Sequence, residues 1–404
     1  MNKIVPDDWM IRELHEICNG ISVGHVGSTA EHYTDASGIK FIRTGDLKNG
    51  KITFSDTKYI TKEFHQQLFK SKLSAGDILV SRVGDTGQAA LVPEGVGEAN
   101  CANIIIIKPS QEVCPDFLLL TINSADFFSQ TASVSIGSAQ SVLNVGIIKK
   151  LKTRIPPLPE QKKIAEILSG VDENIEASKS LLCKIENALQ GLRDQTQFGE
   201  GKQVSIGDLV SRITTGTSVS GENRPCNASE YGVLKVSCVS KGEFLPKENK
   251  VIVGENKERA TMPVRQGMLL MSRANTPELV GACGITNCDY NNLFLPDKVW
   301  NLELADTAQC SKEWLNNALN SQVGRSKLRD ASTGTSDSMR NISQRNFFDT
   351  EILVPPIAIQ NRQNNLIESL CAKKMMTAIN LEKYLMLKTA LSSDLLSGRK
   401  RVSI

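Results

Sequence analysis

The most regular pattern of apolar and polar residues lies in one segment near the middle of the chain. From residue 160 to 194, apolar side chains recur in steps of four and three, interrupted only by Ser178: Ile164, Leu168, Val171, Ile175, Leu182, Ile185, Leu189 and Leu192. Such steps place side chains in one a/d seam of an α-helix. The pattern predicts a helix about 50 Å long at ~1.5 Å per residue. Pro156-Pro157 marks its beginning.

A second, less regular amphipathic helix is predicted near the C-terminus. Its apolar stripe consists of Leu366, Leu370, Leu381, Tyr384 or Leu385, Leu391 and Leu395, and is interrupted at Lys374 and Thr377. Two long amphipathic helices in one chain most simply bury their seams on each other. We therefore expect an antiparallel coiled coil. The alternative is that each helix packs separately on its own globular domain.

The segments before each helix show a different pattern, with short apolar runs between polar and glycine-containing turns. Residues 39–42, 77–81 and 103–108 are predicted strands, the last containing the buried run Ile104-Ile105-Ile106-Ile107. Residues 115–128 are predicted to form one helix, with Pro115 in its first turn. The fold class is therefore mixed α/β.

The chain repeats itself. Pro156-Pro157 recurs as Pro355-Pro356, 199 residues later, and Phe117-Leu118 corresponds to Trp314-Leu315 at an offset of 197. That second offset aligns residues 137–144 with residues 334–341 without a gap. Upstream, Ser81-Arg82 matches Ser272-Arg273, and Gly50 matches Gly242. We predict two globular α/β domains in pseudo-two-fold repeat, 1–155 and 199–354, separated by two helical spacers, 156–198 and 355–404.

Composition permits a nucleic-acid partner without demanding one. The 404 residues carry 47 Lys and Arg against 44 Asp and Glu, a net charge of +3, so a local basic patch matters more than the sum. The polar N-terminus and the lack of an apolar run near ~20 residues predict neither a signal peptide nor a membrane span, and scattered cysteines without a framework suit a reducing cytoplasm. The ten cysteines form no CxxC pair, so no metal site is expected.

Motifs for catalysis on DNA are missing from the sequence. The residues before the proline pairs are Ile155 and Val354, so neither pair belongs to the Asn/Asp-Pro-Pro-aromatic loop of an amino-methyltransferase. No glycine-rich loop has dinucleotide or P-loop spacing. Pro296-Asp297-Lys298 lacks the second acid of a nuclease site. The four histidines lie within the first 65 residues and have no counterparts in the second copy. We predict a non-catalytic chain without a cofactor.

Basic and polar residues at the turns are the candidates for contacts to nucleic acid. Arginine can pair with guanine, glutamine or asparagine with adenine, and hydroxyl groups with phosphate. The candidates are Arg43, Thr44, Arg82, Ser138, Gln140, Asn144, Lys149 and Lys150 in the first copy, and Lys235, Arg273, Ser336 and Arg340 in the second. Lys149 and Lys150 begin a basic cluster at the first hinge, for which a solvated linker face is the alternative.

The repeat separates two kinds of candidate. Arg82 and Arg273 recur at matching positions, and modules that read different sequences should differ where they read. A phosphate-binding or scaffold role is therefore favoured for these two arginines. Positions that differ between the copies, Gln140 against Asp337 and Leu143 against Arg340, are the better candidates for specificity.

Two stretches of the first copy resemble the specificity subunit of type I restriction–modification systems. One is Gly137-Ser138-x-Gln140-Ser141-x-Leu143-Asn144, and the other runs from Leu151 through Arg154-Ile155-Pro156-Pro157-Leu158-Pro159-Glu160-Gln161 to Leu168. Gly76-Asp77-Ile78-Leu79-Val80-Ser81-Arg82 fits the same family. The second spacer departs from it, because Ala358 and Ile359 replace the proline and glutamate.

The resemblance implies a function. Each globular domain would read half of a split, asymmetric double-stranded DNA target, and the antiparallel helices would set the unread gap. Two modification subunits would methylate adenine with S-adenosylmethionine, and restriction subunits would add ATP-driven translocation and cleavage. This chain would supply recognition alone. The alternatives are a stand-alone DNA methyltransferase or nuclease, a protein-binding assembly scaffold, and a silent copy of the same family.

Overall fold

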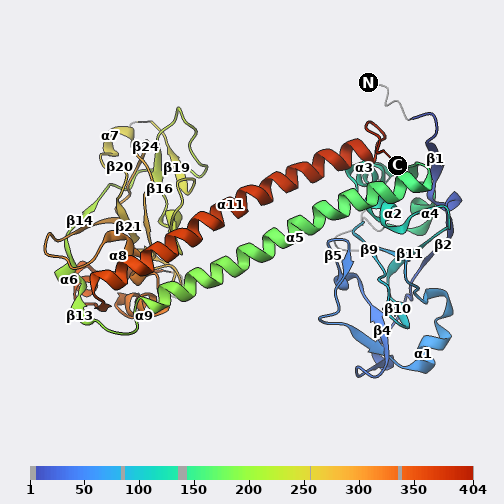
Figure 1. Cartoon of the computed structure of the whole chain (residues 1–404), viewed down its shortest axis with the longest axis horizontal. Helices are drawn as coiled ribbons and strands as arrows, with labels where there is room; N and C mark the ends of the chain where they lie inside the picture. Colours follow the sequence, from blue (N-terminus) through green and yellow to red (C-terminus); the bar gives the residue numbers. More distant parts are fainter. Residues whose placement is uncertain (1–5, 83–86, 135–142, 255, 335–338, 404) are drawn as a thin grey trace. The chain divides into compact units, whose positions relative to one another are not determined.

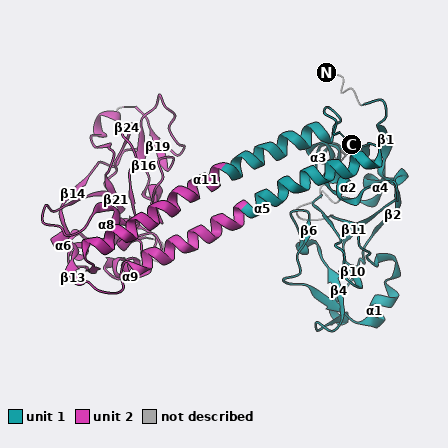
Figure 2. Cartoon of the chain, in the orientation of Figure 1, with its two compact units in different colours: residues 1–177, 380–404 teal, residues 178–379 magenta. Residues whose placement is uncertain are grey.

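The computed structural model describes residues 6–82, 87–134, 143–254, 256–334 and 339–403. The chain forms two compact units (Figure 2). Unit 1 comprises residues 1–177 and 380–404, and unit 2 comprises residues 178–379. The two long helices, α5 (Leu158–Gln195) and α11 (Ile357–Leu395), each contribute to both units (Figure 1).

Unit 1 is built on two four-stranded sheets. The first has the order β2-β11-β8-β9 and the second β10-β4-β7-β3. The first contains β2 (Cys18–Val23), β11 (Ile104–Pro109), β8 (Ile78–Ser81) and β9 (Ala89–Leu91). The second contains β10 (Ala99–Cys101), β4 (Ile39–Ile42), β7 (Lys58–Ile60) and β3 (Tyr33–Thr34). Two further pairs are β1 (Met10–Glu13) with β12 (Lys152–Ile155), and β5 (Leu47–Lys48) with β6 (Lys51–Ile52).

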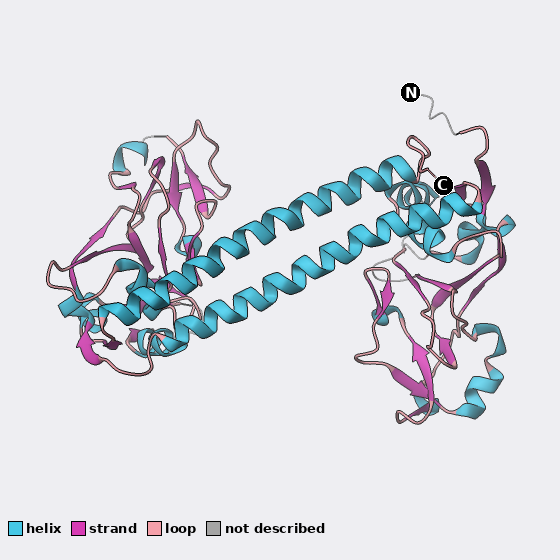
Figure 3. Ribbon diagram, in the orientation of Figure 1, coloured by secondary structure: helices cyan, strands magenta, loops and turns pink. Residues whose placement is uncertain are grey.

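Unit 2 repeats this plan, as the distribution of strands in Figure 3 illustrates. Its larger sheet has the order β14-β25-β21-β23-β18-β17 and its smaller sheet β15-β19-β16-β24-β20. The larger contains β14 (Val210–Thr215), β25 (Val299–Leu304), β21 (Leu269–Ser272), β23 (Cys283–Ile285), β18 (Gly242–Phe244) and β17 (Val239–Ser240). The smaller contains β15 (Gly221–Glu222), β19 (Asn249–Ile252), β16 (Gly232–Leu234), β24 (Tyr290–Phe294) and β20 (Pro263–Val264).

Shorter elements complete both units. Unit 2 also has a three-stranded sheet of β22 (Ala274–Asn275), β27 (Arg340–Ile342) and β26 (Ser332–Thr333), and the pair β13 (Lys202–Ser205) with β28 (Glu351–Val354). The short helices are α1 (Lys62–Gln67), α2 (Pro115–Ile122), α3 (Ala125–Val134), α4 (Val145–Lys150), α6 (Ile206–Leu209), α7 (Asn256–Arg259), α8 (Lys312–Leu319), α9 (Gln322–Asp330) and α10 (Gln344–Phe348).

The predicted strands are confirmed, but the predicted helix over residues 115–128 is wrong as a single element. Ile104 to Ile107 lie fully buried in β11. The helix divides into α2 and α3 at Asn123, whose side chain pairs with the Ala89 backbone: Nδ2 donates to the Ala89 carbonyl, and Oδ1 accepts from the Ala89 amide. Ser124 Oγ then accepts from the Phe127 amide at the start of α3.

The two long helices pack together and run antiparallel, as predicted. In unit 1, Ile164 and Leu168 share a core with Leu395, and Lys388 Nζ lies 2.6 Å from Asp172 Oδ1. In unit 2, Ile185 and Leu189 pack with Ile367. Residues later in α5 thus pack against residues earlier in α11, as in an antiparallel pair of helices. The seam predicted for α5 is buried or half-buried at each apolar position.

The apolar stripe predicted for α11 is wrong at Leu366, and the structure decides between Tyr384 and Leu385. Leu366 is 49% exposed, and its neighbour Ile367, at 4%, occupies the seam. Tyr384 is half-buried whereas Leu385 is exposed. Where two apolar residues are adjacent, only the register of the whole helix decides which one faces its partner. That register also places Lys374 and Thr377 on the seam face, where both are at least partly buried.

Candidate nucleic-acid interface

In the sheet β10-β4-β7-β3 of unit 1, Arg43 and Thr44 follow β4, as predicted for the end of a strand. Arg43 Nη2 donates to the Asp56 carbonyl at 2.8 Å and to Asp56 Oδ2 at 3.2 Å. Asp46 Oδ2 accepts from the Arg43 amide at 2.8 Å. Arg43 therefore ties the turn after β4 to the next loop while a third of its side chain stays exposed. Thr44 is half-buried beside it.

At the end of β8, in the sheet β2-β11-β8-β9 of unit 1, Arg82 is linked to Asn144 through Leu143. Arg82 Nε donates to the Leu143 carbonyl at 3.2 Å, and the Leu143 amide donates back to the Arg82 carbonyl. Asn144 caps α4, its Oδ1 accepting from the Ile147 amide at 2.9 Å. Ser138 and Gln140, and Ser336 in unit 2, lie outside the described residues.

Lys149 and Lys150 are exposed at the last turn of α4. Two other members of the predicted basic cluster have acidic neighbours: Arg154 Nη1 lies 3.0 Å from Asp126 Oδ2, and Lys163 Nζ lies 2.9 Å from Glu166 Oε2. The cluster is therefore less basic than its sequence indicates. The two lysines of α4 remain its best-placed cations for contact with a polyanion.

Unit 2 gathers three candidates around one buried amide. Asn275 is 7% exposed. Its Nδ2 donates to the Val236 carbonyl, next to Lys235, at 3.3 Å. Asn275 also pairs with Arg340 across β22 and β27, and the adjoining Arg273 carbonyl accepts from the Ile342 amide. Lys235, Arg273 and Arg340 are thereby held in one region of the unit. Sequence reasoning missed Asn275, which has no recognisable motif around it.

The two arginines that recur in the repeat, Arg82 and Arg273, have scaffold contacts of the same kind. Arg273 Nε donates to the Asp297 carbonyl at 3.2 Å, much as Arg82 Nε donates to the Leu143 carbonyl. Both side chains are half-buried. One donor of each guanidinium is thus committed to the backbone, and its remaining N–H groups are the ones that can meet a ligand.

The repeat alignment over residues 137–144 is wrong by two positions at its end. The Leu143 amide donates to the Arg82 carbonyl, and the Ile342 amide donates to the Arg273 carbonyl. Leu143 therefore corresponds to Ile342 and not to Arg340. Likewise Asn144 and Ser343 are the caps of α4 and α10. The offset is therefore 199 here, because unit 2 contains two more residues before α10. Matching asparagines at 144 and 341 misled the sequence alignment, and the contrast of Leu143 with Arg340 loses its basis.

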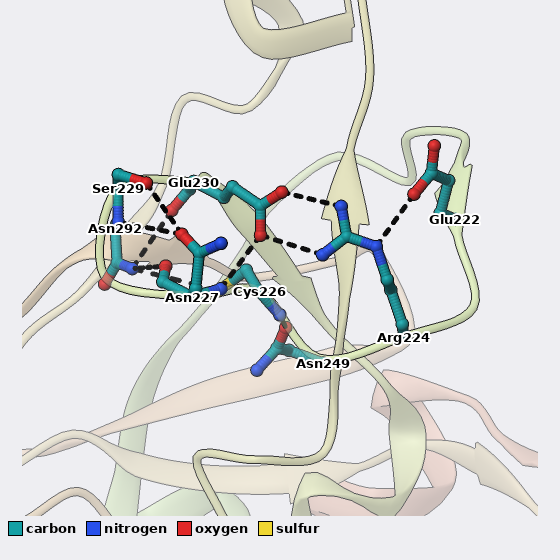
Figure 4. Close-up of polar contacts among 8 residues, drawn as sticks. All are labelled: Glu222, Arg224, Cys226, Asn227, Ser229, Glu230, Asn249 and Asn292. Atoms are coloured by element: carbon teal, nitrogen blue, oxygen red, sulfur yellow. Dashed lines mark hydrogen bonds and ion pairs between the residues drawn. The ribbon is translucent and has the colours of Figure 1, made fainter.

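A polar loop that sequence reasoning passed over lies between β15 and β16 (Figure 4). Arg224 binds Glu230 through two nitrogens, at 2.9 and 2.6 Å, and binds Glu222 at 2.9 Å. The hydrogen bond from Arg224, followed by that from the Asn227 amide, lowers the pKa of Glu230 to about 2. Asn292 donates to the carbonyls of Asn227 and Glu230 and closes the loop. With two carboxylates on Arg224, this exposed loop offers little free positive charge.

Within the described residues, no three His, Cys, Asp or Glu side chains form a group that could hold a metal ion. No helix of that part of the chain combines the length and the apolar content needed to cross a membrane. The candidate interface consists of basic, amide and hydroxyl side chains at or near the ends of strands and helices, a composition suited to phosphate and base-edge contacts.

Comparison with known proteins places these units in a family. Residues 6–187 match the type I restriction modification DNA specificity domain. The chain is 23% identical over 398 residues to the EcoKI specificity subunit of Escherichia coli, spanning 91% of this chain and 83% of that protein. It is 21% identical over 394 residues to the StySPI specificity subunit of Salmonella potsdam, with the same two coverages.

The chain therefore belongs to the specificity subunits of type I restriction–modification systems, which recognise the DNA target within the restriction–modification complex and are themselves non-catalytic. Solved structures agree on the fold. A type I S subunit from M. genitalium matches with a TM-score of 0.59 at 13% identity, over 98% of each chain. A chain from a structure of type I system assembly and conformational transition matches with a TM-score of 0.56 at 17% identity, over 97% of this chain and 98% of that one.

Proposed function

We propose that residues 1–155 and 199–354 each read one half of a split, asymmetric DNA target. The observation that carries this proposal is the gathering of Lys235, Arg273 and Arg340 around Asn275 in unit 2. Unit 1 has related basic residues at its strand ends, Arg43 and Arg82, in different surroundings. Two similar but unequal readers suit an asymmetric target, since two modest half-site affinities multiply when the readers are linked.

The remaining candidates take roles according to their exposure. Lys149 and Lys150 would contact phosphates, because both are exposed and lie at one helix end. Arg340 would contact a base edge, and its neighbours Lys235 and Arg273 would bind the phosphate backbone of the DNA. Ser138, Gln140, Asn144, Thr44 and Ser336 stay in the proposal as polar contacts predicted from the sequence.

The partners belong to the proposal as well. We infer that two modification subunits, acting on adenine in each half-site, and restriction subunits assemble on this chain in the cytoplasm. Support comes from a relative of this chain, which is named as the specificity subunit of the type I restriction enzyme EcoKI. The antiparallel packing of α5 and α11 within each unit supports a ruler between the readers.

The experiment is genome-wide mapping of methylated adenine in cells that express this chain with the modification subunit encoded beside it. The control cells express the modification subunit alone. We expect one split, asymmetric methylated motif that appears only with this chain. A complex that assembles without producing any motif would contradict the proposal and favour a silent copy or a scaffold. Methyl transfer by the purified chain alone would instead favour a stand-alone methyltransferase.

A further inference from the structure

Lys374, which interrupts the apolar seam of α11, has a structural partner on either side. Its Nζ lies 2.8 Å from Glu243 Oε1 on β18 and 3.3 Å from Glu186 Oε1 on α5. Its side chain is 23% exposed. Burial opposes its charge, but the hydrogen bonds and attraction of Glu243 and Glu186 outweigh burial and raise the pKa of Lys374. One ammonium thus joins three elements of unit 2.

The β17–β18 hairpin that carries Glu243 is held at its turn as well. Lys241 and Gly242 both have positive φ, 48° and 77°, as a two-residue hairpin turn requires. Asn316 on α8 donates to the Gly242 carbonyl at 3.0 Å. The guanidinium of Arg193, 4% exposed at the end of α5, lies so close that a Cβ on Gly242 would be 2.7 Å from its Nη2. The hairpin is therefore fixed to both long helices.

Unit 1 contains the same hairpin with different chemistry around it. Its turn is Asn49-Gly50, with φ of 50° and 79°. The repeat places Lys51 where unit 2 has Glu243, and Ile175 where unit 2 has Lys374. Ile175 is 4% exposed in the apolar seam, and Ser392 stands in the place of Arg193. A lysine and an isoleucine cannot form the ion pair seen in unit 2.

We propose that Lys374, bridging Glu243 and Glu186, is a positioning residue that fixes the second recognition domain on its helical segment and makes the placement of its half-site strict. The inference rests on the proposed function for its consequence on DNA, but the clamp itself is a property of unit 2 alone. Because the counterparts in unit 1 lack these charges, we expect its half-site to depend on packing instead.

The first test needs no DNA and uses hydrogen exchange on the full-length chain. We expect Lys374→Met to speed hydrogen exchange at the amides of residues 239–244 about fivefold. A fivefold change corresponds to a loss of about 1 kcal/mol in the free energy of opening, because ~1.4 kcal/mol is tenfold. Lys374→Arg should restore protection, because a guanidinium can reach both carboxylates. Glu243→Gln, a milder change on the hairpin, provides a second variant if Lys374→Met unfolds. Unchanged exchange in Lys374→Met or Glu243→Gln would overturn the clamp.

The second test measures methylation by the assembled complex on duplexes that carry the mapped target, with the native gap or with one base pair added. We expect Lys374→Met to lower the ratio of the native-gap rate to the longer-gap rate about fivefold, with Lys374→Arg close to wild type. Lys51→Met, at the position in the unit 1 hairpin that corresponds to Glu243, should leave the ratio unchanged. A wild-type ratio in Lys374→Met would sink the positioning role, whereas a complex that maps to no target would instead count against the proposed function.

Discussion

At the scale of single residues, two groups of polar side chains differ in what they do. Some are committed to the fold, and others remain available to a ligand. His65 belongs to the first group: it is 4% exposed, and its Nδ1 accepts from Asn100 Nδ2 at 2.7 Å. Asn100 Oδ1 accepts in turn from Ser71 at 2.5 Å. A ring nitrogen that accepts a hydrogen bond carries no proton, as in the neutral imidazole, whereas Glu98 Oε1, 3.6 Å from Nε2, favours the charged form.

The network predicts acid sensitivity of unit 1. Burial, followed by the charge of Lys72, lowers the pKa of His65 from its ordinary 6.5. Below pH 6.5, His65 binds a proton more readily in the unfolded chain than in the folded chain. The free energy of unfolding therefore decreases as the pH falls below 6.5. Urea unfolding between pH 8 and 5 should show this loss, and His65→Gln should reduce its slope. His15→Asn, at an exposed histidine, is the control; equal slopes in both variants would refute the assignment.

Arg340 and Lys150 should respond differently to alanine substitution. In the assembled complex, Arg340→Ala should weaken binding of the mapped target by about 1–3 kcal/mol and relax specificity in one half-site only. Lys150→Ala should weaken all duplexes alike and lower the slope of log K against log salt by about 1. Binding titrations at several salt concentrations separate the two. Uniform loss in Arg340→Ala would make that arginine a phosphate contact.

At the scale of elements, the register of α11 decides which of its apolar residues support the fold. Ile367→Ala should cost about 2–5 kcal/mol, because it empties a site shared with Ile185 and Leu189. Leu366→Ala, at the neighbouring exposed position, should change stability by no more than about 0.5 kcal/mol. Denaturant unfolding of both variants tests the register directly. A larger cost for Leu366→Ala than for Ile367→Ala would mean that the stripe read from the sequence is the buried one.

The C-terminal segment closes unit 1 through a second ionic cluster. Arg401 donates to both oxygens of Glu160, each at 2.7 Å, and to both oxygens of Asp8, each at 2.8 Å. Glu160 is fully buried and also accepts from Trp9 Nε1 at 3.1 Å. Arg401→Met would leave that carboxylate without its cation, so the unfolding temperature of unit 1 should fall. Arg399→Met, at an exposed arginine whose guanidinium binds Asp394 and Ser393, should have little effect.

At the scale of the whole molecule, the long helices make the proposed ruler testable. Removing residues 176–182 from α5 and 378–384 from α11 deletes one heptad from each seam and shortens each helix by about 10 Å. At ~3.4 Å per base pair, the unread gap should shorten by about three base pairs while both half-sites persist. Methylation mapping measures this change. An unchanged gap, in a complex that still methylates, would exclude the ruler.

Much of this architecture follows from the sequence. The heptad spacing of α5 predicted a long helix, and the isoleucine run predicted a buried strand. The proline pairs marked the start of each spacer. These signals can be read from the sequence because they depend only on residues that are neighbours in the chain. The Gly50–Gly242 match paired two glycines that the structure places in equivalent hairpin turns, because a positive φ favours glycine at that position.

Other features depended on contacts between distant segments. Asn123 divides one predicted helix by pairing with Ala89, and the seam of α11 takes Ile367 rather than Leu366 because its partner α5 sets the register. Asn275 unites Lys235, Arg273 and Arg340 across residues far apart in the chain. The sequence alone determined the two-copy plan and its periodic helices, because periodicity is local. Only the tertiary structure decided which polar side chains are spent on the fold and which remain free, because a hydrogen bond depends on where distant backbone groups lie.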